Sequence, residues 1–232
     1  MAKYDGSMTV GAVVAELPAA SHLLKRHRID YCCGGDRPLA AVLAEKGLDL
    51  NKFLGELEAL DAERRAKNAD DRDWRNAASG ELIEHIIQTH HAYLERELPV
   101  LSEYTTKIMR VHGDTHPELG LLHRRFHEMK TELEQHLAAE ENRVFPLLLE
   151  AERSGSGGAK AAALSEIRDA EGEHSAVGEL LREMREITSD YALPPEACRT
   201  YEVTFRKLEE LESDLFQHIH LENNVLFPRL GG

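Results

Sequence analysis

The sequence predicts an all-α protein in which an antiparallel, up-down-up-down four-helix bundle follows a small helical domain. Three observations predict this fold. Apolar residues recur at helical spacing through most of residues 79–230, and three clusters of helix-breaking residues cut that range into four long segments. No part of the sequence shows the alternation that is typical of a strand. Short loops between long helices favour antiparallel neighbours, which gives the bundle its expected topology.

The first part of the chain, residues 1–60, is expected to form the small helical domain. Thr9 and Ser21 are suitable N-cap residues, and apolar residues at helical spacing predict a helix within residues 48–60. Between them, residues 30–35 read Asp-Tyr-Cys-Cys-Gly-Gly, which predicts a tight turn that carries Cys32 and Cys33.

A charge-dense stretch at residues 61–78 predicts a polar linker, and the bundle is expected over residues 79–232. Its loops are expected at the breaker clusters 113–117, 154–158 and 194–196. Pro99 falls within the first long helix. Because the apolar period continues to Leu101, we expect Pro99 to kink this helix rather than end it.

Bulk composition excludes several classes of protein. The formal net charge is −14, with 42 acidic against 28 basic residues, which argues against a nucleic-acid-binding surface. No stretch approaches the roughly 18 apolar residues of a membrane span, and no signal-peptide pattern opens the chain, so a cytoplasmic protein is expected. The 3 cysteines do not make a disulfide framework, whereas 13 histidines are an excess that needs a function.

A metal-ligand pattern occurs twice in the sequence. Residues 135–146 recur as residues 217–228, with Gln, His, Glu, Asn, Phe and Pro in the same places. Each copy has His at position i and Glu at i+4, namely His136 with Glu140 and His218 with Glu222. On a helix such a pair shares one face, about one turn apart. Each copy therefore directs one imidazole and one carboxylate toward the same point.

The other two bundle helices are expected to add one histidine each. His174 is the only histidine of the third helix. On the first helix, apolar residues follow His91 at +3 and +7, as they follow His174, which favours His91 over His90. The midpoints between successive histidines of the set fall in or beside the three expected loops, so all four histidines are expected at one level of the bundle.

One isolated His-x-x-x-Glu is usually a solvated helical pair, but duplication at one level of a bundle favours a metal centre. Six ligands are too many for one structural zinc and suit two ions that keep open positions for an oxo or hydroxo bridge and a small diatomic ligand. Mixed nitrogen and oxygen ligands favour iron over calcium or magnesium, although zinc or manganese can occupy such a site in vitro. The predicted ligands are His91, His136, Glu140, His174, His218 and Glu222.

The remaining histidines are expected outside the ligand set. His85 and His90 are assigned to the surroundings of the centre or to the surface, and His220 to the surface. Solvated positions near one bundle end are expected for His112, His116, His123 and His127. The two Phe-Pro pairs, at residues 145–146 and 227–228, are interpreted as core plugs and helix terminators.

These residues resemble a known family. The bundle with its repeated His-x-x-x-Glu is similar to the hemerythrin fold, and it differs from ferritin-like proteins, whose pattern is Glu-x-x-His. Together with the cysteine turn at residues 30–35 and the sequence Pro-Glu-Ala-Cys at 195–198, it resembles the iron–sulfur cluster repair di-iron proteins over essentially the whole chain. The resemblance implies a homodimeric stress protein that restores iron–sulfur clusters damaged by nitric oxide or peroxide, either by donating iron or by handling nitric oxide.

Cys32 and Cys33 are expected to act with the di-iron centre without being ligands to it. Gly34 and Gly35 permit an open turn that leaves the thiols accessible, while the alternative is a pair of small core residues. Two other functions remain open for the chain: a hemerythrin-like carrier or sensor of NO or O2, and a nitric oxide reductase that uses the same irons. A carrier needs no paired thiols, which favours repair.

Overall fold

The computed structural model of the chain describes residues 3–66 and 73–231, and it divides into two compact units. Unit 1 contains residues 1–82 and 216–232, and unit 2 contains residues 83–215. The described residues contain helices and no strand, apart from one isolated bridge between Thr9 and Pro38. The predicted all-α class and the four-helix bundle are therefore confirmed. No helix of the described part of the chain has the length and apolarity that crossing a membrane requires.

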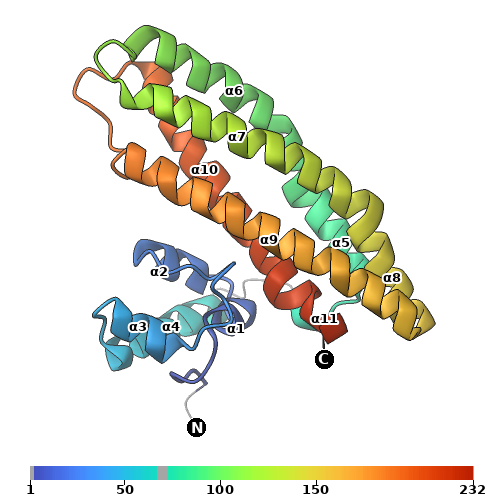
Figure 1. Cartoon of the computed structure of the whole chain (residues 1–232). Coiled ribbons are helices and arrows are strands. Elements are labelled where there is room, and N and C mark those ends of the chain that lie inside the picture. Colours follow the sequence, from blue (N-terminus) through green and yellow to red (C-terminus); the bar gives the residue numbers. More distant parts are fainter. Residues whose placement is uncertain (1–2, 67–72, 232) are drawn as a thin grey trace. The chain divides into compact units, whose positions relative to one another are not determined.

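Four long helical segments build the bundle (Figure 1). Three of them contain short π-helical stretches, so their parts carry separate labels. The first segment consists of α5 (Ser79–Ile86), η2 (Ile87–His91) and α6 (Ala92–His112), and the second of α7 (Glu118–Ala139), η3 (Glu140–Val144) and α8 (Phe145–Ser154). The third is α9 (Gly157–Ile187), and the fourth is α10 (Arg199–Leu221), which continues into η4 (Glu222–Leu226) and α11 (Pro228–Gly231).

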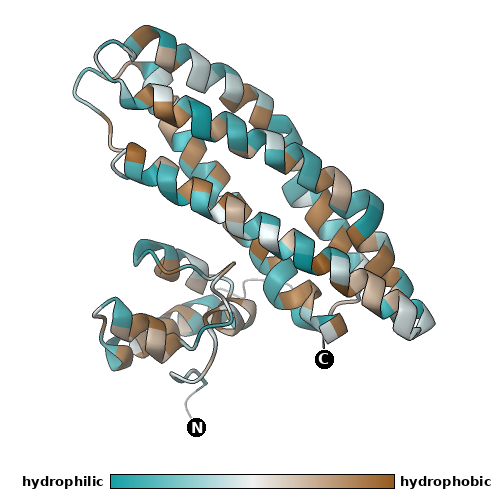
Figure 2. Cartoon of the chain, in the orientation of Figure 1, coloured by the Kyte–Doolittle hydropathy of each residue, from teal (hydrophilic) through white to brown (hydrophobic). Residues whose placement is uncertain are grey.

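Within unit 2, α6 packs against α7, and α9 packs against both α7 and α8 (Figure 1). Ion pairs connect α10 to two of these helices: Lys207 Nζ lies 2.6 Å from Glu97 Oε2 of α6, and Arg185 Nε of α9 lies 2.8 Å from Glu212 Oε2. Each of these helices carries both hydrophobic and hydrophilic residues (Figure 2). Burying each apolar side chain stabilises the fold by about 1.5–3 kcal/mol. The buried apolar core of unit 2 includes Leu94, Leu98, Leu101, Leu122, Phe126, Met129, Leu133, Val177, Leu181, Met184, Phe205, Leu208 and Leu211.

The loops of the bundle lie near the predicted breaker clusters. The first joins α6 to α7 over residues 113–117, as predicted. The second is shorter than predicted: Gly155 has φ 61, which ends α8, and Ser156 caps α9, so Gly157 and Gly158 already belong to the helix. The third loop begins earlier than residue 194, because α9 ends at Ile187. Pro99 lies inside α6, which continues through it as expected.

Unit 1 contains the small helical domain, with α1 (Val10–Glu16), α2 (Ala20–Arg26), α3 (Leu39–Glu45), α4 (Leu50–Ala66) and the 3-10 turn η1 (Trp74–Asn76). Thr9 caps α1 as predicted, because its side chain accepts a hydrogen bond from the Ala12 N–H. The assignment of Ser21 as an N-cap was wrong: Ser21 lies inside α2, and its hydroxyl donates to the Pro18 carbonyl. The core of this domain includes Tyr4, Val10, Val13, Leu17, Leu24, Tyr31, Leu39, Leu43, Phe53 and Leu57.

Part of the range predicted as a linker is helical. Helix α4 continues to Ala66, and its Asp61 is buried at 6% exposure. Ion pairs with Lys3 and Arg65 compensate the charge of this carboxylate. Residues 67–72 of the predicted linker lie outside the described residues. After them, residues 73–78 lead through η1 into α5.

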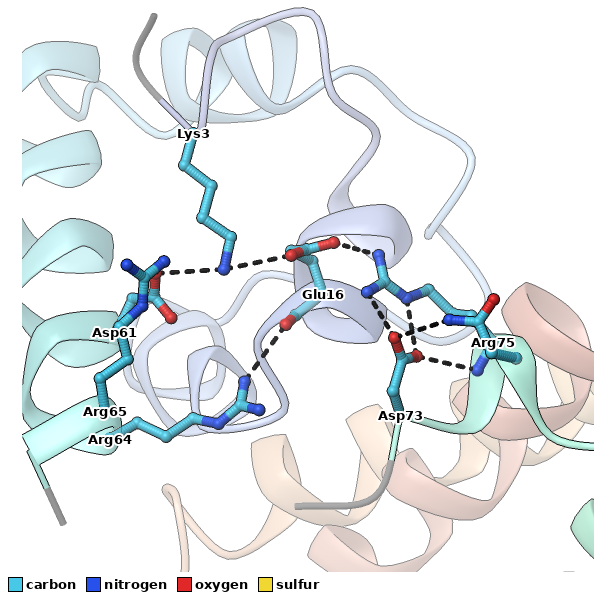
Figure 3. Close-up of polar contacts among 8 residues, drawn as sticks. Lys3, Glu16, Asp61, Arg64, Arg65, Asp73 and Arg75 are labelled. Carbon is cyan, nitrogen blue, oxygen red and sulfur yellow. Dashed lines mark hydrogen bonds and ion pairs between the residues drawn. The ribbon is translucent and has the colours of Figure 1, made fainter. Parts of the chain in front are cut away.

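A network of charged residues connects separate segments of unit 1 (Figure 3). Lys3 Nζ lies 3.1 Å from both Glu16 Oε1 at the end of α1 and Asp61 Oδ2 of α4. The other oxygen of Glu16 pairs with Arg75, whose guanidinium also lies 2.8 Å from Asp73 Oδ2. The Arg75 interaction lowers the pKa of Asp73 to about 2. The network joins the N-terminal segment, α1, α4 and the start of η1.

Candidate metal centre

Three π-helical segments of the described chain lie at predicted metal ligands. Segment η2 ends with His91, η3 begins with Glu140, and η4 begins with Glu222. A π turn widens the helix by one residue and is frequent at functional sites. In η3 and η4 the N–H of the following Phe donates to the carbonyl of the predicted ligand Glu, five residues earlier.

The Phe-Pro pairs follow these π turns directly. Proline in an α-helix clashes with the carbonyl four residues earlier, and a wider turn relieves that clash. The interpretation of Pro146 as a helix terminator was therefore wrong, since α8 continues from Phe145 to Ser154. Phe145 and Phe227 are buried, in agreement with their assignment as core plugs. The Phe145 ring stacks on the ring of His91 at a centroid distance of 5.9 Å.

Four of the predicted ligands cluster inside unit 2, on the first three segments of the bundle. His91, His136, Glu140 and His174 are each at most 3% exposed. Glu140 lies at the middle of the cluster: its Oε1 is 3.2 Å from His136 Nε2 and 3.7 Å from His174 Nε2, and its Oε2 is 3.3 Å from His91 Nε2. The two oxygens of one carboxylate thus face different imidazoles, as a carboxylate that bridges two ions would.

Carboxylates outside the cluster orient two of these imidazoles. His136 Nδ1 lies 2.6 Å from Glu173 Oε2, and His91 Nδ1 lies 2.8 Å from Glu141 Oε1. A carboxylate accepts a hydrogen bond from the Nδ1–H of the imidazole, and this tautomer leaves the lone pair of Nε2 directed at the cluster. Glu141 and Glu173 were not among the residues predicted from the sequence. A signal was present, because each stands next to a predicted ligand in the sequence.

The donor atoms fit a bound metal ion. His136 Nε2 and His174 Nε2 face each other at 3.0 Å, and both lie within 4.8 Å of a Glu140 oxygen. Two nitrogens that bind one ion at right angles, each about 2.1 Å from it, are about 3 Å apart. A cation bound by both nitrogens would also offset the repulsion between their two lone pairs at this distance. The mixed imidazole and carboxylate donors match the preference of iron, zinc or manganese.

The electrostatics of Glu140 favour a carboxylate that is ionised. Burial alone would raise its pKa, but the imidazoles of His136, His174 and His91 outweigh burial and hold the pKa of Glu140 well below its usual range. The carboxylate is therefore a negative charge inside an apolar bundle, and it requires cationic partners to remain there.

The second copy of the motif lies in unit 1. His218 Nε2 is 3.1 Å from Glu222 Oε1, and the two residues are 1% and 0% exposed. The pair has the same i, i+4 spacing and nearly the same separation as His136 and Glu140, at 3.2 Å. The two motif copies therefore have the same local structure, as their sequence repeat suggests.

The histidines expected outside the ligand set have varied environments. His90 directs Nδ1 to Asp214 Oδ1 at 3.0 Å rather than to Glu140. The expectation that His220 is exposed was wrong: it is 2% exposed, its ring packs against Tyr31 at 5.7 Å, and burial lowers its pKa to about 4. Near the loop ends of unit 2, His112 Nε2 lies 3.2 Å from Cys198 Sγ. The rings of His123 and His127 are tilted against each other, with their centroids 4.2 Å apart.

The cysteine turn of unit 1 is attached to the segment that carries Glu222. The Asn224 side chain donates from Nδ2 to the carbonyl of Cys32 at 2.9 Å and to that of Tyr31 at 3.3 Å. A Cβ on Gly11 or on Gly35 would lie 2.2 Å from Asn224 Oδ1, so glycine is required at both positions for Asn224 to reach the turn. The same repeat position in the first copy, Asn142, only caps the Ala138 carbonyl of its own helix.

The two thiols of the turn are not equally accessible. Cys32 is buried, which corrects the expectation of two open thiols, and Cys33 is half-buried. Cys32 Sγ lies 3.8 Å from Cys33 Sγ and 3.2 Å from Asp30 Oδ1. The hydrogen bond to Cys33, followed by burial, raises the pKa of the Cys32 thiol well above its usual range.

Comparisons with known proteins agree with these features. Residues 82–230 match the family described as hemerythrin HHE cation binding domain, and residues 6–61 match a domain of unknown function, DUF542. The chain is 37% identical to the iron–sulfur cluster repair protein YtfE of Escherichia coli O157:H7 over 220 residues, which cover 95% of this chain and 94% of that protein. The protein of the same name from Escherichia fergusonii is equally similar, at 37% identity over the same shares of both chains.

Proposed function

Because this chain belongs to the family of iron–sulfur cluster repair proteins with a hemerythrin cation-binding domain, we propose that it holds two iron ions and repairs damaged iron–sulfur clusters. The position of Glu140 carries the proposal. One of its oxygens faces His136 and His174 while the other faces His91, an arrangement that suits a carboxylate shared by two ions.

The proposed ligand set joins both copies of the repeated motif. His136, Glu140 and His174 would hold one iron, and His91 with Glu140 would hold the other. We propose that His218 and Glu222 complete the set, with Glu222 as the second shared carboxylate. The equal spacing of the two motif copies supports this, as does the family match, which runs unbroken from residue 82 to residue 230. An oxo or hydroxo bridge and a small ligand such as NO or O2 would take the remaining positions.

The proposed chemistry is donation of iron to proteins whose clusters nitric oxide or peroxide has damaged. The imidazoles and carboxylates of the bundle hold the ions and keep them from water, and buried ligands limit uncontrolled loss. Cys32 and Cys33 act together with this centre without being its ligands. The hydrogen bonds from Asn224 support this role, because they attach the cysteine turn two residues from Glu222. We also propose that the protein is a homodimer. Its chain would divide into a small helical domain (residues 1–60), a polar linker (61–78) and the bundle (79–232).

Transfer of labelled iron tests the proposed function. The chain is loaded with ⁵⁷Fe and mixed anaerobically with a [4Fe–4S] enzyme that has been damaged with nitric oxide. We expect ⁵⁷Fe in the restored clusters and recovery of the client's activity, while a Glu140→Gln chain that holds less iron restores less. The control replaces the loaded chain by free Fe²⁺, and both reactions contain an iron chelator. Equal recovery of client activity in the two reactions would contradict donation by the protein.

The same samples separate donation from nitric oxide reduction. Gas analysis after a single addition of nitric oxide measures nitrous oxide. Donation predicts cluster recovery without stoichiometric nitrous oxide. Nitrous oxide formed at one equivalent per two nitric oxide molecules, with no transfer of ⁵⁷Fe, would instead assign the centre to nitric oxide reduction.

A further inference from the structure

The cysteine turn contains three potential metal donors that do not belong to the bundle. Asp30, Cys32 and Cys33 offer a carboxylate oxygen and two sulfurs that all lie within 4.8 Å of one another. The separation of the two sulfurs, 3.8 Å, is far longer than the roughly 2.05 Å of a disulfide, so the pair is a dithiol. We propose that these residues form an additional site for one thiophilic divalent cation, separate from the centre in the bundle.

The distances between the donor atoms suit one tetrahedral ion. With metal–sulfur bonds of about 2.3 Å, the sulfurs at two corners of a tetrahedron are about 3.8 Å apart. Cys32 Sγ and Cys33 Sγ have this separation without any rearrangement. For one sulfur and one carboxylate oxygen the corresponding distance is about 3.5 Å. Cys32 Sγ and Asp30 Oδ1 are 3.2 Å apart, so only a small shift is needed.

Hydrogen bonds from the backbone and from the Asn224 side chain hold the turn and its donors in place. Asp30 Oδ1 accepts the N–H groups of Cys32 at 2.9 Å and Cys33 at 3.0 Å, which fixes the carboxylate against the turn. On the other side, Asn224 Nδ2 binds the Cys32 carbonyl at 2.9 Å. A site that is ordered before the ion arrives loses less conformational entropy when it binds.

The site is open on one side, which distinguishes it from a structural zinc site. Asp30 is exposed and Cys33 is half-buried, whereas Cys32 forms the buried wall. Three protein donors leave a fourth position for water or for a ligand from another molecule, as in sites where metals exchange or react. Sulfur donors select Fe²⁺, Zn²⁺ or Cd²⁺ over Mg²⁺ and Ca²⁺. Binding exchanges two thiol protons for one divalent cation, with no change of oxidation state.

A role in iron transfer follows for this site, and this role alone rests on the proposed function. An iron ion that passes between the bundle and a damaged cluster needs temporary ligands. Two thiolates and one carboxylate with a free fourth position can hold Fe²⁺ and exchange it with the cysteine thiolates of a cluster protein. The binding of a cation at the turn does not depend on that role.

Cadmium titration tests the site in the intact protein. The full chain, with its bundle iron present and its thiols reduced, is titrated with Cd²⁺ while the ultraviolet sulfur-to-cadmium charge-transfer band is recorded. We expect one equivalent of Cd²⁺ per chain and release of two protons. Cys33→Ser should abolish most of the band, and Asp30→Asn, which keeps the Oδ1 acceptor of the turn, should weaken Cd²⁺ affinity at least about tenfold. Fe²⁺ should compete for the site.

The third cysteine provides the matched control. Cys198 is exposed and lies outside the turn, so Cys198→Ser should leave the band unchanged. A band that survives in Cys33→Ser, or that disappears in Cys198→Ser, would overturn the site, as would no band in the parent chain. The iron content of each sample is measured in parallel. A parent chain that cannot be loaded with bundle iron but still shows the cadmium band would refute the di-iron centre and leave this site standing.

Discussion

Glu140 is the residue on which the proposed metal centre depends most. Its carboxylate is fully buried and faces three imidazoles, so its replacement by Gln removes the negative charge and one shared donor. We expect Glu140→Gln to lose most of the bound iron in elemental analysis. Glu173→Gln, which removes only the outer partner of His136, should weaken metal affinity by about 10–100-fold. Full iron retention in Glu140→Gln would refute its role as a ligand.

The neighbouring histidines His90 and His91 give a second test at the scale of single residues. Both are buried, but His91 faces Glu140 whereas His90 faces Asp214. We expect His91→Ala to abolish or shift the visible absorption of the iron-loaded protein and His90→Ala to change it little. The opposite pattern would show that the ligand has been assigned to the wrong histidine.

Sequence patterns predicted the surroundings of a side chain well only where residues close in the sequence provide those surroundings. Spacing of i, i+4 predicted that His136 and Glu140 share a face, and they lie 3.2 Å apart. The apolar spacing after His91 favoured it over His90, and its Nε2 lies 3.3 Å from Glu140 Oε2. His220 was misassigned because its burial comes from Tyr31, which is 189 positions earlier in the chain. A helical pattern shows which residues share a face and gives no information on which distant segment covers that face.

At the scale of elements, the repeated motif provides a matched pair of asparagines. Asn224 holds the cysteine turn, whereas Asn142 is exposed and bonds only to its own helix. Asn224→Ala leaves the Cys32 carbonyl without this donor and should lower the free energy of unfolding by about 1–3 kcal/mol. Asn142→Ala should change it by less than about 0.5 kcal/mol. Urea unfolding of both variants measures the difference, and equal values would contradict the role of Asn224.

Gly35 and Gly55 form a second matched pair. A Cβ on Gly35 would lie 2.2 Å from Asn224 Oδ1 and 2.7 Å from the Tyr31 carbonyl oxygen, so Gly35→Ala must displace the turn. Gly55 lies inside α4 with nothing within 4 Å of an added Cβ, so Gly55→Ala should stabilise the protein by about 0.5–1 kcal/mol. Thermal unfolding should show opposite shifts. A Gly35→Ala chain as stable as the parent would mean that the turn tolerates a different geometry.

Helix number and loop positions could be predicted from the sequence, but the π turns could not. Helix-breaking clusters mark loops because Gly and Pro act locally, and only the extents were in error, as at Gly157 and Gly158. A π turn depends on a balance between the Pro clash, the packing of Phe145 and the placement of Glu140. No single residue type signals that balance, so the interpretation of Pro146 as a terminator followed from the rule for ordinary helices.

At the scale of the whole molecule, the two copies of the motif have different surroundings. The first copy lies in unit 2 with His91 and His174, and the second lies in unit 1, where its asparagine binds the cysteine turn. The sequence repeat predicts that both copies supply metal ligands. It did not predict that the second copy also anchors the turn, since that contact depends on Gly11 and Gly35 in a domain with no repeat partner.

The number and coupling of irons in the full chain test the central claim most directly. The chain is prepared with ⁵⁷Fe, and elemental analysis is combined with Mössbauer spectroscopy at low temperature. We predict two irons per chain that form one magnetically coupled pair, with both lost together in Glu140→Gln or Glu222→Gln. One iron per chain, or two that are magnetically independent, would contradict a di-iron centre built from the two motif copies.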